Sequence, residues 1–325
     1  MATVPGGIFG TGNISSSEGA NISSFLDKLG LSEGSITQVT VSTTGTNTIS
    51  DTTPTSTFTV GSGQTVNVVL SGSTGKTLIV TGSGNASIVG GAGSDSVLGG
   101  AGSDSIFGGI GDDQVRGGEG NDILYGGTGN DVVFGRQAAD GDGNNELEGN
   151  LGNDSIVGGT GNDTLRGGKD NDTVEGTAGN NSLYGGLGDD SMLGGTGNDT
   201  IQANEGNDTL SAGNAVAAEL RGGKGNDSIV GGTGSDTLYS GMGSDTLTGG
   251  AGDDIFSFKG GDQAATITDF GTGNDKIEIA GYSFDQLTNA NNGSGNAVIS
   301  MPDGTTIELQ GVDAATLTAD FFLFS

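Results

Sequence analysis

Aspartate recurs at nearly every ninth position through the middle of this chain, each time inside the same short phrase. Residues 90–98 read GGAGSDSVL and residues 99–107 read GGAGSDSIF. The glycines of the first six positions permit positive φ and let backbone carbonyls approach an ion closely. Carbonyl and carboxylate oxygens are hard ligands, which suit a cation that takes about six to eight oxygens. The chain contains neither His nor Cys, the ligands that zinc and copper prefer. The phrase therefore predicts Ca²⁺ binding.

Two kinds of residue in each copy are candidate calcium ligands. The first is the sixth-place aspartate: Asp95, Asp104, Asp113, Asp122, Asp131, Asp154, Asp163, Asp172, Asp190, Asp199, Asp208, Asp227, Asp236, Asp245 and Asp254. The second is the glycine at the second or fourth place: Gly91, Gly93, Gly100, Gly102, Gly109, Gly111, Gly118, Gly120, Gly127, Gly129, Gly159, Gly161, Gly186, Gly188, Gly195, Gly197, Gly223, Gly225, Gly232 and Gly234. An array of this kind predicts multiple Ca²⁺ ions.

The last three residues of each copy form a minimal β-strand whose middle side chain faces inward, because alternate strand residues point to opposite faces. The eighth place is apolar in every copy: Val97, Ile106, Val115, Leu124, Val133, Leu147, Ile156, Leu165, Val174, Leu183, Met192, Ile201, Leu210, Leu220, Ile229, Leu238, Leu247 and Phe256. One such side chain every nine residues makes a continuous core only if the copies stack. The pattern therefore predicts an all-β solenoid.

The phrase resembles the nonapeptide G-G-x-G-x-D-x-U-x of RTX (hemolysin-type) calcium-binding proteins, over about half of the chain. That resemblance implies a parallel β-roll in which two copies make one turn. It also implies that calcium lies between turns stacked on the same edge. Asp95 would then share an ion with the loop that contains Asp113.

The composition is strongly acidic, with 40 acidic and 10 basic residues and a formal net charge of −30. This balance argues against nucleic acid and anionic membranes as partners, because their phosphates require Lys and Arg. No stretch is long and apolar enough to predict a membrane span. With so little apolar mass and so many aligned carboxylates, the calcium-free repeats are not expected to offset their chain entropy. Calcium binding and folding are therefore expected to be one event.

Three irregularities interrupt the repeat. Residues 135–148 carry about five extra residues, which are expected to bulge from one edge either as a tolerated insertion or as a recognition loop. Asn181 replaces the aspartate and is expected to weaken its site, because an amide oxygen coordinates without charge. Residues 212–221 contain no aspartate, so the sites that this copy would share with its neighbours are weakened or lost.

Four segments are expected. Residues 1–34 form an N-terminal segment with a short amphipathic helix over Ser17–Leu29, where apolar residues recur at helical spacing before Gly30. Residues 35–89 alternate as strands without the acid, and they are expected to be a calcium-free β section that leads into the solenoid; a separate β-domain in residues 35–70 is the alternative. Residues 90–257 are the β-roll. Residues 258–325 are a C-terminal β cap and secretion segment.

The C-terminal segment resembles the one that closes the roll in RTX proteases and many other RTX proteins. Pro302-Asp303-Gly304 is a strong turn signal between strands at residues 297–300 and 305–309. The ending DFFLFS resembles uncleaved type I secretion signals, and the start lacks the features of a cleaved signal peptide. These features predict a secreted protein, extracellular or on the cell surface, with the type I secretion machinery as a partner.

The sequence predicts that this protein is not an enzyme, because a chain without His cannot build H-E-x-x-H or a Ser-His-Asp triad. The favoured function is a secreted structural or surface protein of an S-layer, extracellular matrix or filament, which includes self-assembly. The alternative is a carbohydrate-binding or adhesive module with cell-surface polysaccharide as its ligand. Two remote alternatives are ice binding, through broken Thr-x-Asn ranks, and a polysaccharide-modifying enzyme with paired carboxylates.

Overall fold

The computed structural model describes residues 37–40, 46–49, 55–135 and 143–325. The chain divides into two compact units, Met1–Leu165 and Arg166–Ser325. The described residues are almost entirely β-strand, and their helical elements are the short 3-10 turns η2 (Phe284–Gln286), η3 (Ala314–Thr316) and η4 (Ala319–Phe321). None of their helices is long and apolar enough to cross a membrane. The helix expected over Ser17–Leu29 lies outside the described residues.

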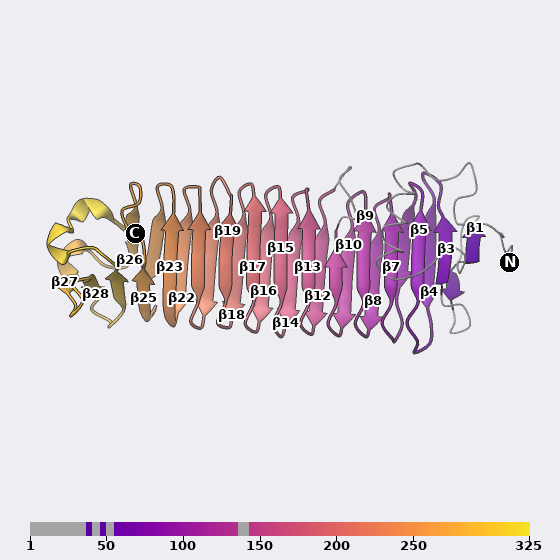
Figure 1. Ribbon diagram of the computed structural model, residues 1–325, viewed down its shortest axis with the longest axis horizontal. Helices are drawn as coiled ribbons and strands as arrows, with labels where there is room; N and C mark the ends of the chain where they lie inside the picture. The colour runs from indigo at the N-terminus through magenta and orange to yellow at the C-terminus, as the bar shows by residue number, and fades with distance from the viewer. Residues whose placement is uncertain (1–36, 41–45, 50–54, 136–142) are drawn as a thin grey trace. The chain divides into compact units, whose positions relative to one another are not determined.

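The first unit is a parallel β-solenoid of two sheets (Figure 1). The odd-numbered strands follow one another in one sheet, from β1 to β13, and the even-numbered strands form the other, from β2 to β12. The strands are β1 (Thr37–Thr40), β2 (Thr46–Ile49), β3 (Thr55–Thr59), β4 (Thr65–Leu70), β5 (Thr77–Thr81), β6 (Asn85–Val89), β7 (Ser96–Gly100), β8 (Ser105–Ile110), β9 (Gln114–Gly118), β10 (Ile123–Thr128), β11 (Val132–Phe134), β12 (Glu146–Leu151) and β13 (Ser155–Gly159). Because the chain changes sheet after every strand, two repeat copies make one turn.

The second unit continues the same pattern of alternating strands, and the strands of its two sheets run in opposite directions in Figure 1. Strand β14 (Thr164–Lys169) contains the boundary between the units. The other strands are β15 (Thr173–Ala178), β16 (Ser182–Leu187), β17 (Ser191–Thr196), β18 (Thr200–Glu205), β19 (Thr209–Gly213), β20 (Glu219–Lys224), β21 (Ser228–Gly232), β22 (Thr237–Met242), β23 (Ser244–Gly250), β24 (Ile255–Lys259), β25 (Ala264–Ile267), β26 (Lys276–Ala280), β27 (Thr288–Asn291), β28 (Ala297–Ser300), β29 (Thr306–Leu309) and β30 (Phe322–Phe324). The all-β solenoid predicted from the sequence is confirmed.

The core of each unit is built from the eighth-place side chains, as the repeat pattern predicts. Leu124 pairs in register with Ile106 on one side and with Leu147 on the other, and all three are fully buried. The same position is buried in every copy from Val97 to Phe256. Each turn contributes two such side chains, so the core is thin and depends on its neighbours above and below.

Glycine at the second place lets successive turns approach closely. Gly127 has φ +125°, and a Cβ there would lie 2.2 Å from the carbonyl oxygen of Gly109. Gly186 has φ +131°, and a Cβ there would lie 2.0 Å from the carbonyl oxygen of Gly168. A side chain would therefore both strain the backbone and force the turns apart.

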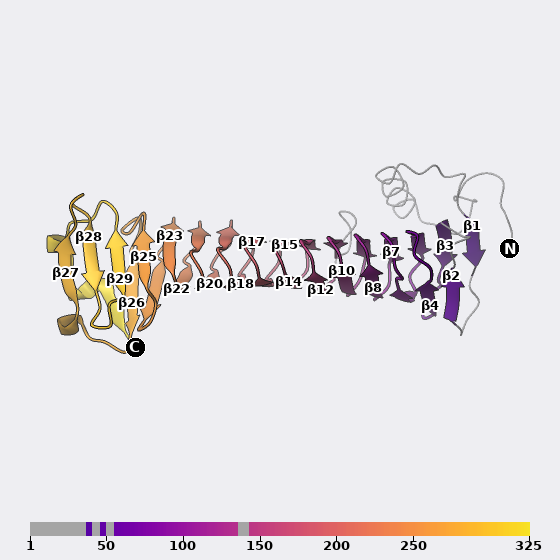
Figure 2. The ribbon, with the colours of Figure 1, turned by 90° about the horizontal axis from the view of Figure 1, so that it is seen from below.

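Two segments outside the repeat block extend the sheets. Upstream, β4 pairs in parallel with β6, and β6 pairs with the first repeat strand of its sheet, β8. Downstream, β25 pairs in parallel with β29, which continues through antiparallel pairs to β28 and β27 (Figure 2). The predicted strand–turn–strand around Pro302-Asp303-Gly304 is confirmed by the antiparallel pairing of β28 with β29. The boundaries of the four expected segments remain predictions.

We predict that Leu210→Ala lowers the free energy of unfolding by about 2–5 kcal/mol, because Leu210 is fully buried on β19 and its loss leaves a cavity. The measurement is the denaturant midpoint of the calcium-saturated protein. Leu193→Ala is the control, because Leu193 is 38% exposed on the neighbouring strand β17 and should change stability by no more than about 0.5 kcal/mol. Equal shifts in the two variants would contradict the assignment of the core.

Candidate metal centre

The sixth-place aspartates lie in the turns, where they link one turn to the next. In the first unit, the Asp95 amide donates to Oδ1 of Asp113 at 2.7 Å, and the Asp113 amide donates to Oδ1 of Asp131 at 2.8 Å. On the other edge the Asp104 amide donates to Oδ1 of Asp122 at 2.8 Å. Residues eighteen apart are therefore bonded on one edge, as the predicted pairing of the Asp95 and Asp113 loops requires. We call these two series the aspartate ladders.

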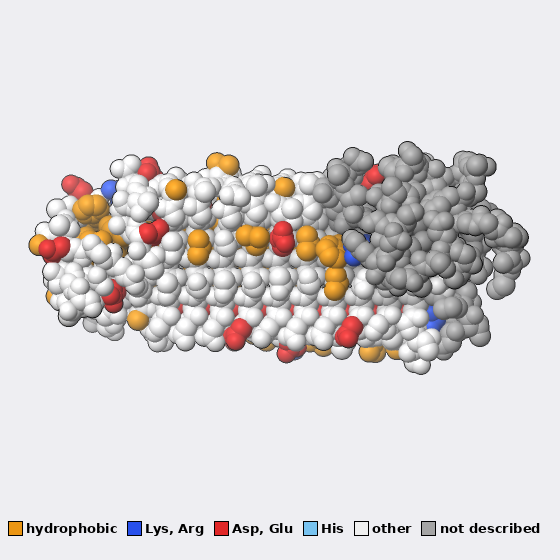
Figure 3. All heavy atoms as spheres, in the orientation of Figure 1, with side chains coloured by type: hydrophobic (Ala, Val, Ile, Leu, Met, Phe, Trp, Pro, Cys, Tyr) orange, Lys and Arg blue, Asp and Glu red, His pale blue; other side chains and the backbone are white. Residues whose placement is uncertain are grey.

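The same ladders run through the second unit. The Asp190 amide donates to Oδ1 of Asp208 at 2.7 Å, and the Asp227 amide donates to Oδ1 of Asp245 at 2.9 Å. All fifteen predicted aspartate ligands are buried, at no more than 3% exposure: Asp95, Asp104, Asp113, Asp122, Asp131, Asp154, Asp163, Asp172, Asp190, Asp199, Asp208, Asp227, Asp236, Asp245 and Asp254. The ladder carboxylates are thus largely hidden, and Figure 3 shows few acidic side chains on the visible face of the second unit despite the chain's net charge of −30.

The feature of these ladders that calls for a metal ion is the second carboxylate oxygen, Oδ2. Oδ2 is buried and accepts no hydrogen bond at Asp104, Asp113, Asp131, Asp190, Asp199, Asp208, Asp227, Asp236, Asp245 and Asp254. Leaving an ionised oxygen buried without a partner is costly unless a counter-charge compensates it. The ladder therefore supplies a regular series of oxygens that require a cation.

In several turns a backbone carbonyl oxygen lies beside the same space as Oδ2. A Cβ added to Gly99 would meet Oδ2 of Asp104 at 2.3 Å and the carbonyl oxygen of Gly117 at 2.7 Å. The carboxylate of one copy and the carbonyl of the copy eighteen residues later thus converge beside a glycine that leaves the space open. Gly231 repeats this arrangement in the second unit, with Oδ2 of Asp236 at 2.7 Å and the carbonyl of Gly249 at 2.5 Å.

These sites, each made of a carboxylate and a carbonyl oxygen, fit calcium better than a metal that is held by a group of three or more His, Cys, Asp or Glu side chains. Among the described residues no three His, Cys, Asp or Glu side chains gather into a metal-binding group. One carboxylate and one backbone carbonyl, found together in several turns, instead suit a hard cation whose coordination shell is completed by carbonyls and water. Calcium would supply the positive charge that the buried Oδ2 atoms lack.

The glycines beside the carboxylates are functional residues that the sequence reasoning missed. They occupy the first place of the phrase: Gly99, Gly108, Gly117, Gly126, Gly167, Gly185, Gly194, Gly222, Gly231 and Gly249. The predicted ligand glycines of the second and fourth places lie where turns approach: a Cβ on Gly109 would meet the Gly91 carbonyl at 2.3 Å, and one on Gly197 the Gly179 carbonyl at 2.0 Å. The invariably small first residue was the signal that could have shown this.

Burial raises the pKa of several aspartates in the ladders. Burial raises the pKa of Asp104, Asp113 and Asp227 to about 7. At Asp113 the backbone hydrogen bond from Asp95 opposes the rise, while the neighbouring carboxylates, that of Asp131 foremost, add to it. Burial also raises the pKa of Asp131, Asp190, Asp236 and Asp245 to about 6. Proton and cation therefore compete for the same oxygens.

Side chains at the fifth place of the phrase form a separate, exposed ladder that the sequence analysis did not predict. The Asn130 amide donates to Oδ1 of Asp112 at 2.8 Å, and the Asn198 amide donates to Oδ1 of Asn180 at 2.8 Å. These bonds run from the later turn to the earlier side chain, opposite to the aspartate ladders. Each turn is thus tied in both directions, which explains the frequent Asn and Asp at this place.

The interruptions keep the register. The Asp122 amide donates to Oδ1 of Asn145, 23 residues later instead of the usual eighteen, so the extra residues of 135–148 leave the ladder intact and Asn145 takes the aspartate position. Residues 136–142 lie outside the described part. Asn181 holds its ladder position through a 2.8 Å bond to Oδ1 of Asp199. In the copy without aspartate Ala218 stands in its place, and its amide donates to Asp236.

One aspartate ladder extends beyond Ser257, the residue at which the sequence analysis places the end of the β-roll; that boundary stays a prediction. Residues 271–278 read GTGNDKIE, and the Asp254 amide donates to Oδ1 of Asp275 at 3.0 Å. Ile277 is buried in register with Phe256. Oδ2 of Asp275, however, accepts the Gly271 amide at 2.7 Å, and Oδ2 of Asp95 accepts the Gly91 amide at 3.2 Å. Backbone amides satisfy the Oδ2 atoms of these two terminal aspartates, unlike the ten buried Oδ2 atoms named above.

The family model described as RTX calcium-binding nonapeptide repeat (4 copies) matches residues 80–115, 107–141, 140–174, 166–201, 184–215 and 220–262, together more than half of the chain. A solution structure of a subunit of the mannuronan C5-epimerase from Azotobacter vinelandii is similar at 22% identity and TM-score 0.25, over 48% of this chain and 79% of that one. The extracellular lipase LipA from Serratia marcescens is similar at 18% identity and TM-score 0.27, over 69% of this chain and 45% of the lipase. This chain therefore spans less than half of that lipase. No curated protein matches the chain in sequence.

We predict that Asp113→Asn raises the calcium concentration at the folding midpoint by about three- to ten-fold, because it removes the charge of a buried Oδ2 while keeping the Asp95 hydrogen bond. The measurement is a calcium titration followed by circular dichroism. Asp112→Asn is the matched control: its exposed side chain accepts the Asn130 amide, which an amide oxygen also accepts. Equal effects of the two substitutions would count against the buried site.

The raised pKa values predict an acid-stabilised calcium-free fold. The folded-state pKa values of about 6 to 7 exceed the ordinary value of 3.8, so between these limits the folded chain binds more protons than the unfolded chain. This contribution to stability is fully present below about pH 4 and is lost as the pH rises through 6 to 7. In EGTA, β-structure measured by circular dichroism should increase from pH 8 to about pH 4.5, with light scattering as the control for aggregation. A flat profile in the soluble protein would contradict it.

Proposed function

The chain belongs to the family of RTX calcium-binding nonapeptide repeat proteins, and on this premise we propose that it is a secreted structural or surface protein that folds on binding extracellular calcium. The RTX repeats bind calcium, and the finer role is the proposal. The observation that supports it is the series of buried Oδ2 atoms without hydrogen-bond partners, repeated at successive turns in both units. A fold that buries so many uncompensated carboxylates depends on a cation at each step.

The proposed mechanism follows from where calcium is scarce and where it is abundant. Without calcium, the ladder carboxylates repel one another and the thin core does not offset the entropy of a glycine-rich chain. The unfolded chain is then suited to export through a type I secretion channel. Extracellular calcium sites of this kind have dissociation constants of about 10⁻⁴ to 10⁻³ M, so folding would be completed only outside the cell.

A non-catalytic role is part of the proposal. The chain contains no His and no Cys, and most of its buried carboxylates are committed to the two ladders. Regular turns of one repeated phrase provide a stiff surface and edges suited to assembly. We therefore place the protein among S-layer, matrix or filament components, with self-association as its working state.

We predict that the chain is unfolded in excess EGTA at neutral pH and gains β-structure cooperatively on addition of calcium at about 10⁻⁴ to 10⁻³ M. Circular dichroism during the titration is the measurement, and an equal concentration of magnesium is the control, because magnesium requires a smaller octahedral shell. Complete β-structure in EGTA would contradict the proposal that folding depends on calcium. Electron microscopy of the calcium-loaded protein then tests the structural role: sheets or fibres support it, and dispersed single molecules contradict it.

A further inference from the structure

A groove of about 600 Å³ crosses the outer face of the even-numbered sheet in the second unit. Part of its lining is a rank of ninth-place side chains, which pair in register across five consecutive strands of this sheet, from β18 to β26. They are Gln202, Arg221, Tyr239, Ser257 and Glu278. We call this set the groove rank. Its volume lies in the range of sites that bind small molecules or segments of a polymer.

The groove gathers the rare cations of a strongly acidic chain. Of ten basic residues in the chain, Arg221, Lys224 and Lys259 line it. The acidic residues that line it are Glu205, Asp262 and Glu278. The groove is therefore close to neutral on a chain with a formal charge of −30. The lining therefore has no net charge of its own with which to attract a charged polymer, and the surrounding negative charge would repel a polyanion.

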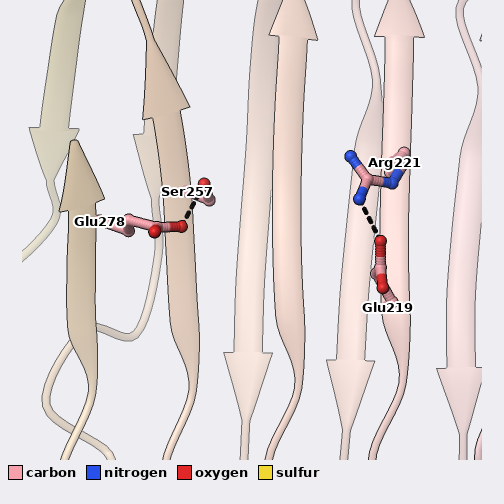
Figure 4. Close-up of polar contacts among 4 residues, drawn as sticks. All are labelled: Glu219, Arg221, Ser257 and Glu278. Atoms are coloured by element: carbon pink, nitrogen blue, oxygen red, sulfur yellow. Dashed lines mark hydrogen bonds and ion pairs between the residues drawn. The ribbon is translucent and has the colours of Figure 1, made fainter. Parts of the chain in front are cut away.

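The groove rank is held in place by contacts among its own members and their neighbours. Arg221 pairs with Glu219, and Ser257 donates to Oε2 of Glu278 at 2.8 Å (Figure 4). The Arg221 guanidinium lies 3.8 Å from the centre of the Tyr239 ring. An aromatic ring fixed by a cation in this way offers a preorganised apolar surface beside polar groups.

The chemistry of the lining fits hydroxyl groups. A hydroxyl donates one hydrogen bond and accepts others, so it is best bound where donors and acceptors alternate. Arg221 and Lys259 donate, Glu278 accepts, and the amide of Gln202 does both. The rank repeats once per strand, at about 4.8 Å, which suits an extended chain of similar units more than one compact molecule.

We propose that this groove binds a neutral polysaccharide, with Tyr239 as the ring on which a sugar stacks. The site lies on a sheet face, whereas the aspartate ladders lie in the turns, so it is a function distinct from calcium binding. It requires the folded repeats and therefore rests on the proposed calcium-dependent folding. Neutral sugar chains present hydroxyls in both senses and an apolar ring face, which the lining matches.

Affinity electrophoresis of the calcium-loaded full chain tests this inference. The gels contain a soluble neutral polysaccharide, such as a β-glucan, a xylan or a galactomannan, or an anionic one, such as alginate or pectate. We expect retardation in at least one neutral gel, and we expect Tyr239→Ala to weaken it about ten-fold. Gln202→Ala, which changes one end of the groove rank, should also weaken it.

Tyr184→Ala is the matched control, because Tyr184 occupies the ninth place of β16 with Arg166 5.5 Å from its ring centre but does not line the groove. It should leave the retardation unchanged. No retardation in any neutral gel, retardation in anionic gels alone, or equal loss in Tyr239→Ala and Tyr184→Ala would overturn the proposal. Circular dichroism in calcium separates the two hypotheses: a chain that folds but does not bind defeats only this inference, and one that does not fold defeats the proposed function.

Discussion

The structure depends on carboxylate oxygens that are buried in the turns with no hydrogen-bond partner. At Asp113 and Asp227, Oδ1 accepts the backbone amide of an aspartate in the preceding turn, while Oδ2 has no hydrogen-bond partner and lies beside a glycine near a carbonyl of the following turn. The core cannot compensate for this burial, since each copy contributes one apolar side chain. A cation beside each such oxygen therefore decides whether the stacked turns are stable, and the fold and the metal sites are one system.

Much of this was predictable because the repeat has a single period. The inward eighth place follows from nine-residue spacing and strand alternation, whereas the two strands per turn and the pairing of aspartates eighteen apart were implied by the resemblance to RTX repeats. The sequence did not show which structural role each small residue has. Gly99 leaves room beside a carboxylate, whereas Gly100 permits close approach of a neighbouring turn, and both appear as the same letter. Likewise, the ladder role of Asn145 was hidden by the extra residues before it, and that of Asp275 by a phrase with one glycine fewer.

Function is divided between the turns and the sheet faces. The turns hold buried acids, and their composition is fixed by the ion. The outward ninth place varies from Phe107 and Tyr125 in the first unit to Arg221 and Glu278 in the second, although Leu98 at this place is buried. The proposed polysaccharide groove therefore uses positions at which the residue type varies from strand to strand, away from the proposed metal sites in the turns.

The hydrogen bonds of the aspartate ladders and those of the fifth-place ladder run in opposite directions, and this has a consequence for the assembly of the fold. A completed turn presents both a sixth-place amide that can donate to a carboxylate and a fifth-place side-chain oxygen that can accept an amide, as at Asp190 and Asp189. The next turn finds its hydrogen-bond partners, its core neighbour and half of an ion site already in place. Each folded turn is therefore a template for the following one. Folding of the repeats is then expected to be limited by nucleation of the first turns, after which further turns add readily.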